Sequence, residues 1–158
     1  YFELSLKHQL QADLLPTLTA ILEAAGSEGA KAEARMAIGR AGKAEAARAV
    51  IPYLRDDSPE IRSSAAVALG SLGTDEGAEE LYHALAAERD KWTRINMAAA
   101  AGRMKILPTA EILIPWLDDP DVDVKTAAFS TLRAISGQSF GLDAARWQKW
   151  WEAARLRR

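Results

Sequence analysis

Residues 51–70 read IPYLRDDSPEIRSSAAVALG. They hold the end of one amphipathic segment, an acidic turn and the start of a second amphipathic segment. In the turn, residues 57–60 place a capping residue and a proline before a helix, with an acid in its first turn. Pro52 interrupts the first segment one turn before its end, where proline costs about 3 kcal/mol unless the helix is kinked. This stretch therefore predicts a helix, a turn and a second helix.

The same pattern recurs along the chain. Gly39, Gly70 and Gly102 are spaced by 31 and then 32 residues, and Arg133 takes the next position. In each first helix the apolar residues are spaced as i, i+3, i+4 and i+7, which forms one stripe on a helix. They are Ala47, Val50, Ile51 and Leu54; Ala78, Leu81, Tyr82 and Leu85; and Ala110, Leu113, Ile114 and Leu117. Such self-similarity predicts a repeat protein.

The second helix of each unit carries a stripe of its own. These stripes are Ile61, Ala65, Ala68, Leu69 and Leu72; Thr93, Met97, Ala100, Ala101 and Met104; and Val124, Ala128, Thr131, Leu132 and Ile135. Two antiparallel helices with one stripe each cannot enclose a core alone, whereas stacked neighbours can. Strand-like alternation is confined to Phe2, Leu4 and Leu6. We therefore predict an all-α fold with little or no sheet.

The composition is that of a globular chain with balanced charge. Of 158 residues, 49% are hydrophobic, and 20 basic against 22 acidic side chains leave a formal net charge of −2. This balance gives no long-range field for collecting nucleic acid or anionic lipid. The absence of cysteine excludes disulfides, thiolate metal sites and a cysteine nucleophile. No apolar run approaches the roughly 20 residues of a membrane span. We expect no nucleic-acid or membrane partner, and a cytoplasmic location is only slightly favoured.

Residues 51–62, followed by residues 65–70, resemble HEAT repeats of the short bacterial kind, also described as phycobilisome-lyase-like. The resemblance covers roughly residues 14–137. It implies an α-α superhelix, a right-handed solenoid of about four helical hairpins with a C-terminal capping helix. The hairpins are expected at residues 14–42, 44–73, 75–105 and 108–137, and the cap at 142–156. We expect one domain over residues 1–158, belonging to a larger bacterial protein.

The resemblance also implies polar links between adjacent units. In such repeats an aspartate after the first helix and an arginine in the second helix form a ladder. Asp57 with Arg62 and Asp119 with Lys125 match these positions, and Arg94 matches the basic position alone. The third unit departs from the pattern, because its turn between helices is longer by one residue.

The C-terminal segment predicts a helix that closes the stack. Asp143 is placed to cap this helix, and Leu142 and Trp147 occupy the positions of a hydrophobic staple. Three tryptophans at helical spacing indicate core packing rather than an aromatic cage or a base-stacking platform. They are Trp147, Trp150 and Trp151, and Trp92 and Trp116 are likewise expected to pack between helices.

No pattern in the sequence indicates catalysis or metal binding. Four aspartates within residues 118–123 resemble the start of an EF-hand loop. Counting from Asp119, however, Val124 and Ser130 stand where that loop needs glycine and glutamate, so helix capping is favoured. His83 is expected on the outer surface of a first helix. We therefore predict no catalytic residue, no metal site and no cofactor.

The predicted binding surface is the concave face of the solenoid, which second helices line. Positions that flank the buried stripes should point into it. The candidate partner-binding residues are Met36, Arg40, Ser64, Val67, Ser71, Asn96, Arg103 and Ser130. Small residues leave the middle open, while Arg40 and Arg103 supply cations for carboxylates of an extended or helical segment. The alternative interpretation is that these are ordinary solvated helix faces.

The sequence thus predicts a protein–protein interaction scaffold that binds a protein or peptide as a monomer, and not an enzyme. Two alternatives stay open. One is an enzyme or enzyme subunit similar to bilin lyases or DNA alkyl-base glycosylases, the latter requiring a strongly basic groove. The other is a purely structural spacer whose surface binds nothing.

Overall fold

The computed structural model describes residues 43–157, without the side chain of Lys43, and in this range it contains helices and no strand. The order is α3 (Lys43–Val50), η1 (Ile51–Arg55), α4 (Pro59–Leu72), α5 (Ala78–Ala87), α6 (Lys91–Arg103), η2 (Leu107–Thr109), α7 (Ala110–Leu113), η3 (Pro115–Asp118), α8 (Val122–Ser136) and α9 (Ala144–Arg155). The prediction of an all-α fold is confirmed for this part of the chain. None of its helices has the length and hydrophobicity to cross a membrane.

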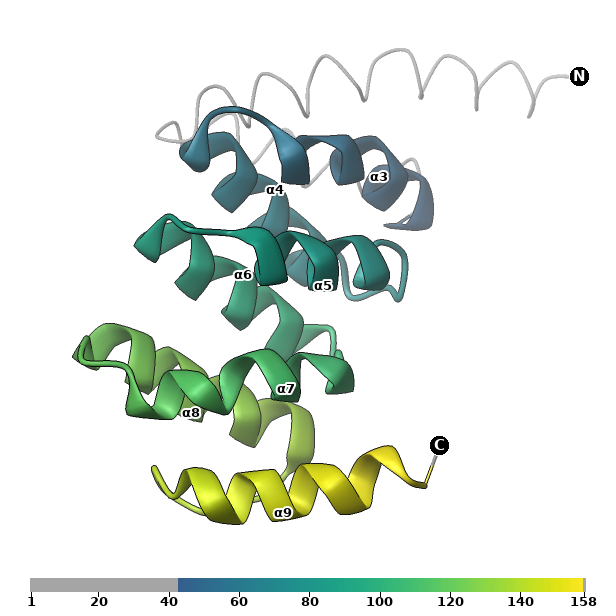
Figure 1. The fold of residues 1–158 in the computed structure, drawn as a ribbon. Helices are drawn as coiled ribbons and strands as arrows, with labels where there is room; N and C mark the ends of the chain where they lie inside the picture. Colours follow the sequence, from purple (N-terminus) through teal and green to yellow (C-terminus); the bar gives the residue numbers. More distant parts are fainter. Residues whose placement is uncertain (1–42, 158) are drawn as a thin grey trace, which may run out of the picture.

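The helices alternate between two rows (Figure 1). The first helices, α3, α5 and α7, form one row together with the 3-10 segments η1 and η3. The second helices, α4, α6 and α8, form the other row, in which α6 packs against α4 on one side and α8 on the other. Helix α9 lies at the end of the stack against α7 and η3. The predicted first hairpin, residues 14–42 with Gly39, lies outside the described residues.

The core lies between the two rows. It is built from the stripes that the repeat comparison predicts, with Ile61, Ala68, Ala78, Tyr82, Ile51 and Ile135 only half-buried at its margin. Apolar burial contributes about 25 cal/mol per Å², so stacking the hairpins supplies the stabilisation that one hairpin lacks.

Prolines and caps set the ends of the helices, as predicted for Pro52 and for the turn at residues 57–60. Helix α3 gives way to η1 at Ile51, directly before Pro52, and η3 begins at Pro115, because proline has no N–H to continue an α-helix. Ser58 and Asp121 accept hydrogen bonds from the first-turn N–H groups of α4 and α8. Gly73, with φ 64°, adopts the left-handed conformation that ends α4.

The recurring glycine marks the closest approach of two second helices. A Cβ atom on Gly70 would lie 2.9 Å from the Cα atom of Ala100 in α6. A Cβ atom on Gly102 would lie 3.3 Å from the Cγ2 atom of Thr131 in α8. The glycine repeat therefore reflects helix contact. Arg133, at the same position of α8, is exposed.

Four of the five predictions about the tryptophans are confirmed, with Trp150 half-buried against the core, whereas the predictions for Trp92 and for the staple residue Leu142 are wrong. Trp147 and Trp151 are buried in the core, and Trp116 packs between helices. Trp92, however, is 60% exposed, because it lies on the side of α6 that faces away from the first helices. Leu142 does not form the staple either, since it is 54% exposed. Phe140 takes that place, with its ring edge-on to Trp147 at 4.9 Å between centroids.

Candidate functional site

The second helices turn one side away from the core, and we call this side the second-helix face. Along each helix its positions are spaced as i, i+4, i+7 and i+11, which keeps them on one side of a helix. They are Glu60, Ser64, Val67 and Ser71 in α4; Trp92, Asn96, Ala99 and Arg103 in α6; and Asp123, Ala127, Ser130 and Ala134 in α8. All twelve are exposed or half-buried, whereas the opposite sides of the same helices are buried.

The N-terminal edge of this face carries an exposed indole among charged groups. Trp92 stands at the helix position that Glu60 occupies in α4 and Asp123 in α8. The Lys91 ammonium lies 4.6 Å from the centroid of the Trp92 ring. The same nitrogen is 2.7 Å from carboxylate oxygens of both Asp121 and Asp123. The hydrogen bonds from Lys91 lower the pKa of the Asp121 carboxyl and raise the pKa of the lysine itself.

Glu60 lies on the other side of Trp92, at the start of α4. Its carboxylate accepts a hydrogen bond of 2.7 Å from the Ser58 hydroxyl, which lowers the pKa of Glu60. Among the described residues no cation forms an ion pair with it. The carboxylate is therefore ionised at neutral pH and open to a cation from outside.

The middle of the second-helix face is weakly polar and carries no charged side chain. Ser64, Val67, Ala99 and Ser130 present only short side chains. Asn96 is the exception, and its Nδ2 atom donates a hydrogen bond of 2.7 Å to the Ser63 hydroxyl of α4. This bond fixes the amide, and the Asn96 Oδ1 atom accepts no hydrogen bond from any described residue. A backbone could therefore approach this surface closely and donate to that oxygen.

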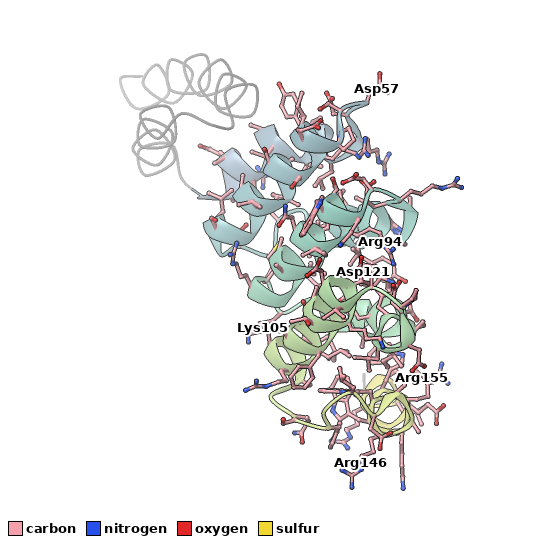
Figure 2. All side chains as sticks on the ribbon, turned by 90° about the vertical axis from the view of Figure 1, so that its left-hand side faces the viewer. Asp57, Arg94, Lys105, Asp121, Arg146 and Arg155 are labelled. Carbon is pink, nitrogen blue, oxygen red and sulfur yellow. The ribbon has the colours of Figure 1, made fainter. Side chains whose placement is uncertain are left out.

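The C-terminal edge is basic. Arg103 is exposed and forms no ion pair with the part of the chain that the structure describes. Its neighbours on the face are Ser71, whose hydroxyl donates to the Val67 carbonyl oxygen at 2.9 Å, and Ala134. Figure 2 shows Lys105, which follows α6, on the opposite side of the stack from Asp57 before α4. Acids at helix N-termini and cations at C-termini also complement the helix dipoles.

Six of the eight predicted site residues lie together on this face. They are Ser64, Val67, Ser71, Asn96, Arg103 and Ser130, while Met36 and Arg40 lie outside the described residues. The sequence interpretation missed Glu60, Trp92 and Asp123. One further step of four residues toward each helix N-terminus would have found them, because the i, i+4 spacing continues there.

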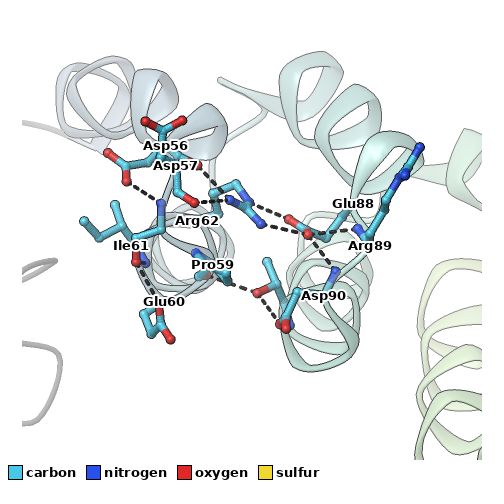
Figure 3. Close-up of polar contacts among 11 residues, drawn as sticks. Asp56, Asp57, Pro59, Glu60, Ile61, Arg62, Glu88, Arg89 and Asp90 are labelled. Atoms are coloured by element: carbon cyan, nitrogen blue, oxygen red, sulfur yellow. Dashed lines mark hydrogen bonds and ion pairs between the residues drawn. The ribbon is translucent and has the colours of Figure 1, made fainter.

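The predicted ladder between units exists with different partners (Figure 3). Arg62 donates to the backbone carbonyl oxygens of Asp56 and Asp57, at 2.8 and 3.0 Å, rather than to the Asp57 carboxylate. Its guanidinium also forms a bidentate pair with Glu88 of the next unit, at 2.6 and 3.0 Å. The longer turn of the third unit supplies that glutamate.

The other two predicted ladder positions also differ from the resemblance. No ion pair joins Asp119 to Lys125 within residues 43–157; Asp119 accepts a hydrogen bond from the Asp121 N–H instead. Arg94 stacks on the Trp116 ring, 4.1 Å from its centroid. The polar contacts between the third and fourth units are instead the ion pairs of Lys91 with Asp121 and Asp123.

His83 lies on the outer side of α5, as predicted, and it is exposed. Its ring is edge-on to Tyr82, and its Nε2 atom is 3.8 Å from Glu79. Both aromatic residues line a shallow hollow of about 530 Å³ between α5 and residues 104–108. Within the described residues no group of three or more His, Cys, Asp or Glu side chains is placed to hold a metal ion.

Comparison with known proteins identifies one family. The family model described as HEAT repeats matches residues 15–102, which is more than half of the chain. None of the curated proteins compared with the chain matches it.

Proposed function

The chain belongs to the HEAT-repeat family, and from this premise we propose that it is a scaffold that binds a polypeptide segment of another protein on its second-helix face. In this proposal the chain acts by binding, and it neither catalyses a reaction nor takes a metal or cofactor. Repeat arrays use such continuous surfaces to hold extended partners.

One observation carries the proposal. Arg103 stands exposed at the edge of a surface whose middle is built from small side chains. A guanidinium held on a rigid helix is well suited to pair with a carboxylate. Small neighbours let the backbone of a bound segment come close enough for that pair to form.

The finer architecture is part of the same proposal. It consists of about four hairpins in a right-handed solenoid, closed by α9, and acting as a single monomeric domain of a larger bacterial protein. The second-helix face is then the concave side of the solenoid.

The experiment that tests this function starts with a photo-crosslinking residue in place of Ala99, in the middle of the second-helix face. A second variant carries it in place of Glu79, on the outer side of α5. Crosslinking in the native host followed by mass spectrometry identifies proteins that are captured from Ala99 and not from Glu79. Capture from neither position would favour a spacer.

The affinity of variants of the chain for the captured partner then tests whether the partner binds on the second-helix face. We expect Arg103→Glu to weaken binding at least about tenfold, since it places a like charge against the partner's carboxylate. Arg55→Glu, which reverses an exposed cation off the face, is the control. Circular dichroism should show both variants folded, because surface substitutions change stability by no more than about 0.5 kcal/mol. Unchanged affinity in folded Arg103→Glu would contradict the proposal.

A further inference from the structure

We propose that Trp92 is the contact point for a cationic side chain, a lysine or an arginine, of the polypeptide bound on the second-helix face. This inference rests on the function proposed above and specifies the chemistry of the partner. It concerns the N-terminal edge of the face, whereas the function rests on Arg103 at the C-terminal edge.

The first observation is the exposure of the indole. Trp92 is 60% exposed although the other described tryptophans are buried or half-buried in the core. Beyond Asn96 the middle of the face carries short side chains such as Ser64 and Ala99, so the exposed indole is the largest apolar group on the face. Tryptophan is among the residues most enriched at the energetic centres of protein interfaces, and it is the aromatic ring that attracts cations best.

The second observation is that the ring already attracts a cation of its own chain. The Lys91 ammonium lies 4.6 Å from the ring centroid. It also lies between Asp121 and Asp123, at 2.7 Å from each. One positive charge is thus shared by an aromatic face and two carboxylates, and the rest of the indole remains open to solvent.

The third observation is the excess of negative charge around the ring. The N-cap and the first two residues of α4, α6 and α8 carry four carboxylates and a single ammonium. The carboxylates are those of Glu60, Asp90, Asp121 and Asp123. Glu60, at the matching position of α4, forms no ion pair within the described residues. A cation that settles on the open part of the ring therefore gains both the aromatic face and the Glu60 carboxylate.

The surface next to Trp92 fits a peptide backbone. Asn96 lies one turn further along α6, and its amide is fixed by the hydrogen bond to Ser63. The free Oδ1 atom can accept from a backbone N–H of the bound segment. Arg103 lies eleven residues beyond Trp92, about 16 Å along the helix axis at 1.5 Å per residue. The two charged contacts are therefore far enough apart to be tested separately.

The test is a selection of short random peptides displayed on phage against the immobilised full chain. The same library is selected in parallel against Trp92→Ala and against Val122→Ala. Val122 is the matched control, because it is exposed and apolar at the start of α8 but does not belong to the second-helix face. We expect enrichment of lysine- or arginine-containing peptides on the wild type and on Val122→Ala, and its loss on Trp92→Ala.

Synthetic versions of the enriched peptides then give affinities by calorimetry. Trp92→Ala should weaken binding about tenfold, and Trp92→Phe and Glu60→Gln should each weaken it by less. Lys91→Met should act in the opposite direction and strengthen binding about twofold, because it removes a like charge from the site. Replacing the peptide's basic residue by citrulline or norleucine should lower affinity as Trp92→Ala does.

The outcomes separate this inference from the proposed function. Peptides that need Arg103 but bind Trp92→Ala and the wild type equally would overturn the inference and leave the function standing. Enrichment of peptides without basic residues, or no enrichment at all, would also overturn it. A gain in affinity from Trp92→Ala would show that the indole obstructs the site, which equally contradicts the proposal.

Discussion

Gly70 and Gly102 occupy the same repeat position, yet the structure distinguishes them. The atom that a Cβ on Gly70 would meet at 2.9 Å is a backbone atom of α6, which cannot move without shifting the helix. The atom that a Cβ on Gly102 would meet at 3.3 Å is a methyl group of Thr131, which has some freedom to yield. Replacing glycine by alanine in a helix otherwise gains about 0.5–1 kcal/mol.

We therefore predict that Gly70→Ala lowers the free energy of unfolding by about 1–3 kcal/mol, as overpacking of a tight contact does. Gly102→Ala should change it by less than about 1 kcal/mol, because the gain in helix propensity offsets a smaller strain. Urea unfolding followed by circular dichroism measures both. An equal loss in both variants would contradict the distinction between a backbone contact and a side-chain contact, and no loss in either would mean that the helices move apart without cost.

At the scale of single residues, the sequence predicted which helix a residue belongs to better than it predicted the contact that the residue makes. The glycine spacing located the second helices. It did not show that neighbouring second helices approach so closely that Gly70 leaves no room for a side chain. Trp92 and Trp147 have the same side chain, and the sequence predicted that Trp147 lies in the core and that Trp92 packs between helices. Only the direction in which each leaves its helix, relative to the neighbouring row, decides that one is exposed and the other buried.

At the scale of the helical elements, the sequence predicted that polar contacts link adjacent units, but it did not predict which side chains form them. The resemblance to HEAT repeats pointed to Arg62, because it lies in a regular helix whose positions match those of such repeats. It did not point to Glu88, because that residue lies in a turn that departs from the pattern. The carboxylate is almost fully buried, with 3% of its side chain exposed, and the Arg62 side chain is 19% exposed. The irregular turn therefore supplies the partner that the regular repeat lacks.

We predict that Glu88→Gln lowers the free energy of unfolding by about 1.5–3 kcal/mol, the range for hydrogen bonds that involve a charged group. Glu79→Gln, on a glutamate whose side chain is 86% exposed, is the control and should change little. Thermal unfolding at neutral pH compares the two. A melting temperature of Glu88→Gln equal to that of the control would contradict a stabilising role of the pair between Arg62 and Glu88.

The pair between Arg62 and Glu88 should also make part of the free energy of unfolding depend on pH. Burial alone would raise the pKa of Glu88, but the hydrogen bonds from Arg62 and from the N–H groups of Asp90 and Arg89 outweigh it, so the pKa lies below its ordinary value. A carboxyl with a lowered pKa stabilises the fold above its unfolded value and loses this contribution as pH falls through the folded value. The difference in melting temperature between wild type and Glu88→Gln should therefore narrow in acid. A difference that stays constant would assign the effect to packing.

At the scale of the whole molecule, the stack ends differently in its two rows. In the row of second helices, Phe129 and Arg133 of α8 stand where α4 and α6 have small buried residues against the next helix. The Arg133 guanidinium lies 5.5 Å from the centroid of the Phe129 ring. No second helix packs beyond α8 within residues 43–157, and these large side chains occupy its free flank. In the row of first helices the end is covered by α9.

Helix α9 is fixed at this end by one tryptophan above all. Trp147 is fully buried, and its ring lies edge-on to Phe140 and Trp150, at 4.9 and 5.8 Å between centroids. Its Nε1 atom donates a hydrogen bond of 2.9 Å to the Gly141 carbonyl oxygen, which ties the helix to the turn before it. The outer side of α9 is polar, with Arg146 pointing away from the stack (Figure 2), and Arg155 is exposed at the end of the helix. A buried inner side and a charged outer side are what a terminal helix needs.

We predict that Trp147→Ala lowers the free energy of unfolding by about 3–5 kcal/mol, the usual cost of removing a buried indole. Leu142→Ala, at the exposed neighbouring position, should cost less than about 0.5 kcal/mol. Denaturant unfolding of the two variants beside the wild type makes the comparison. Helix α9 lies at the end of the stack and packs against α7 and η3. The folded Trp147→Ala variant should therefore bind the peptides selected on the wild-type chain with unchanged affinity. An unfolding free energy equal to the wild type would mean that α9 does not close the stack, and a loss of peptide affinity in the folded variant would place the binding surface at this end of the molecule.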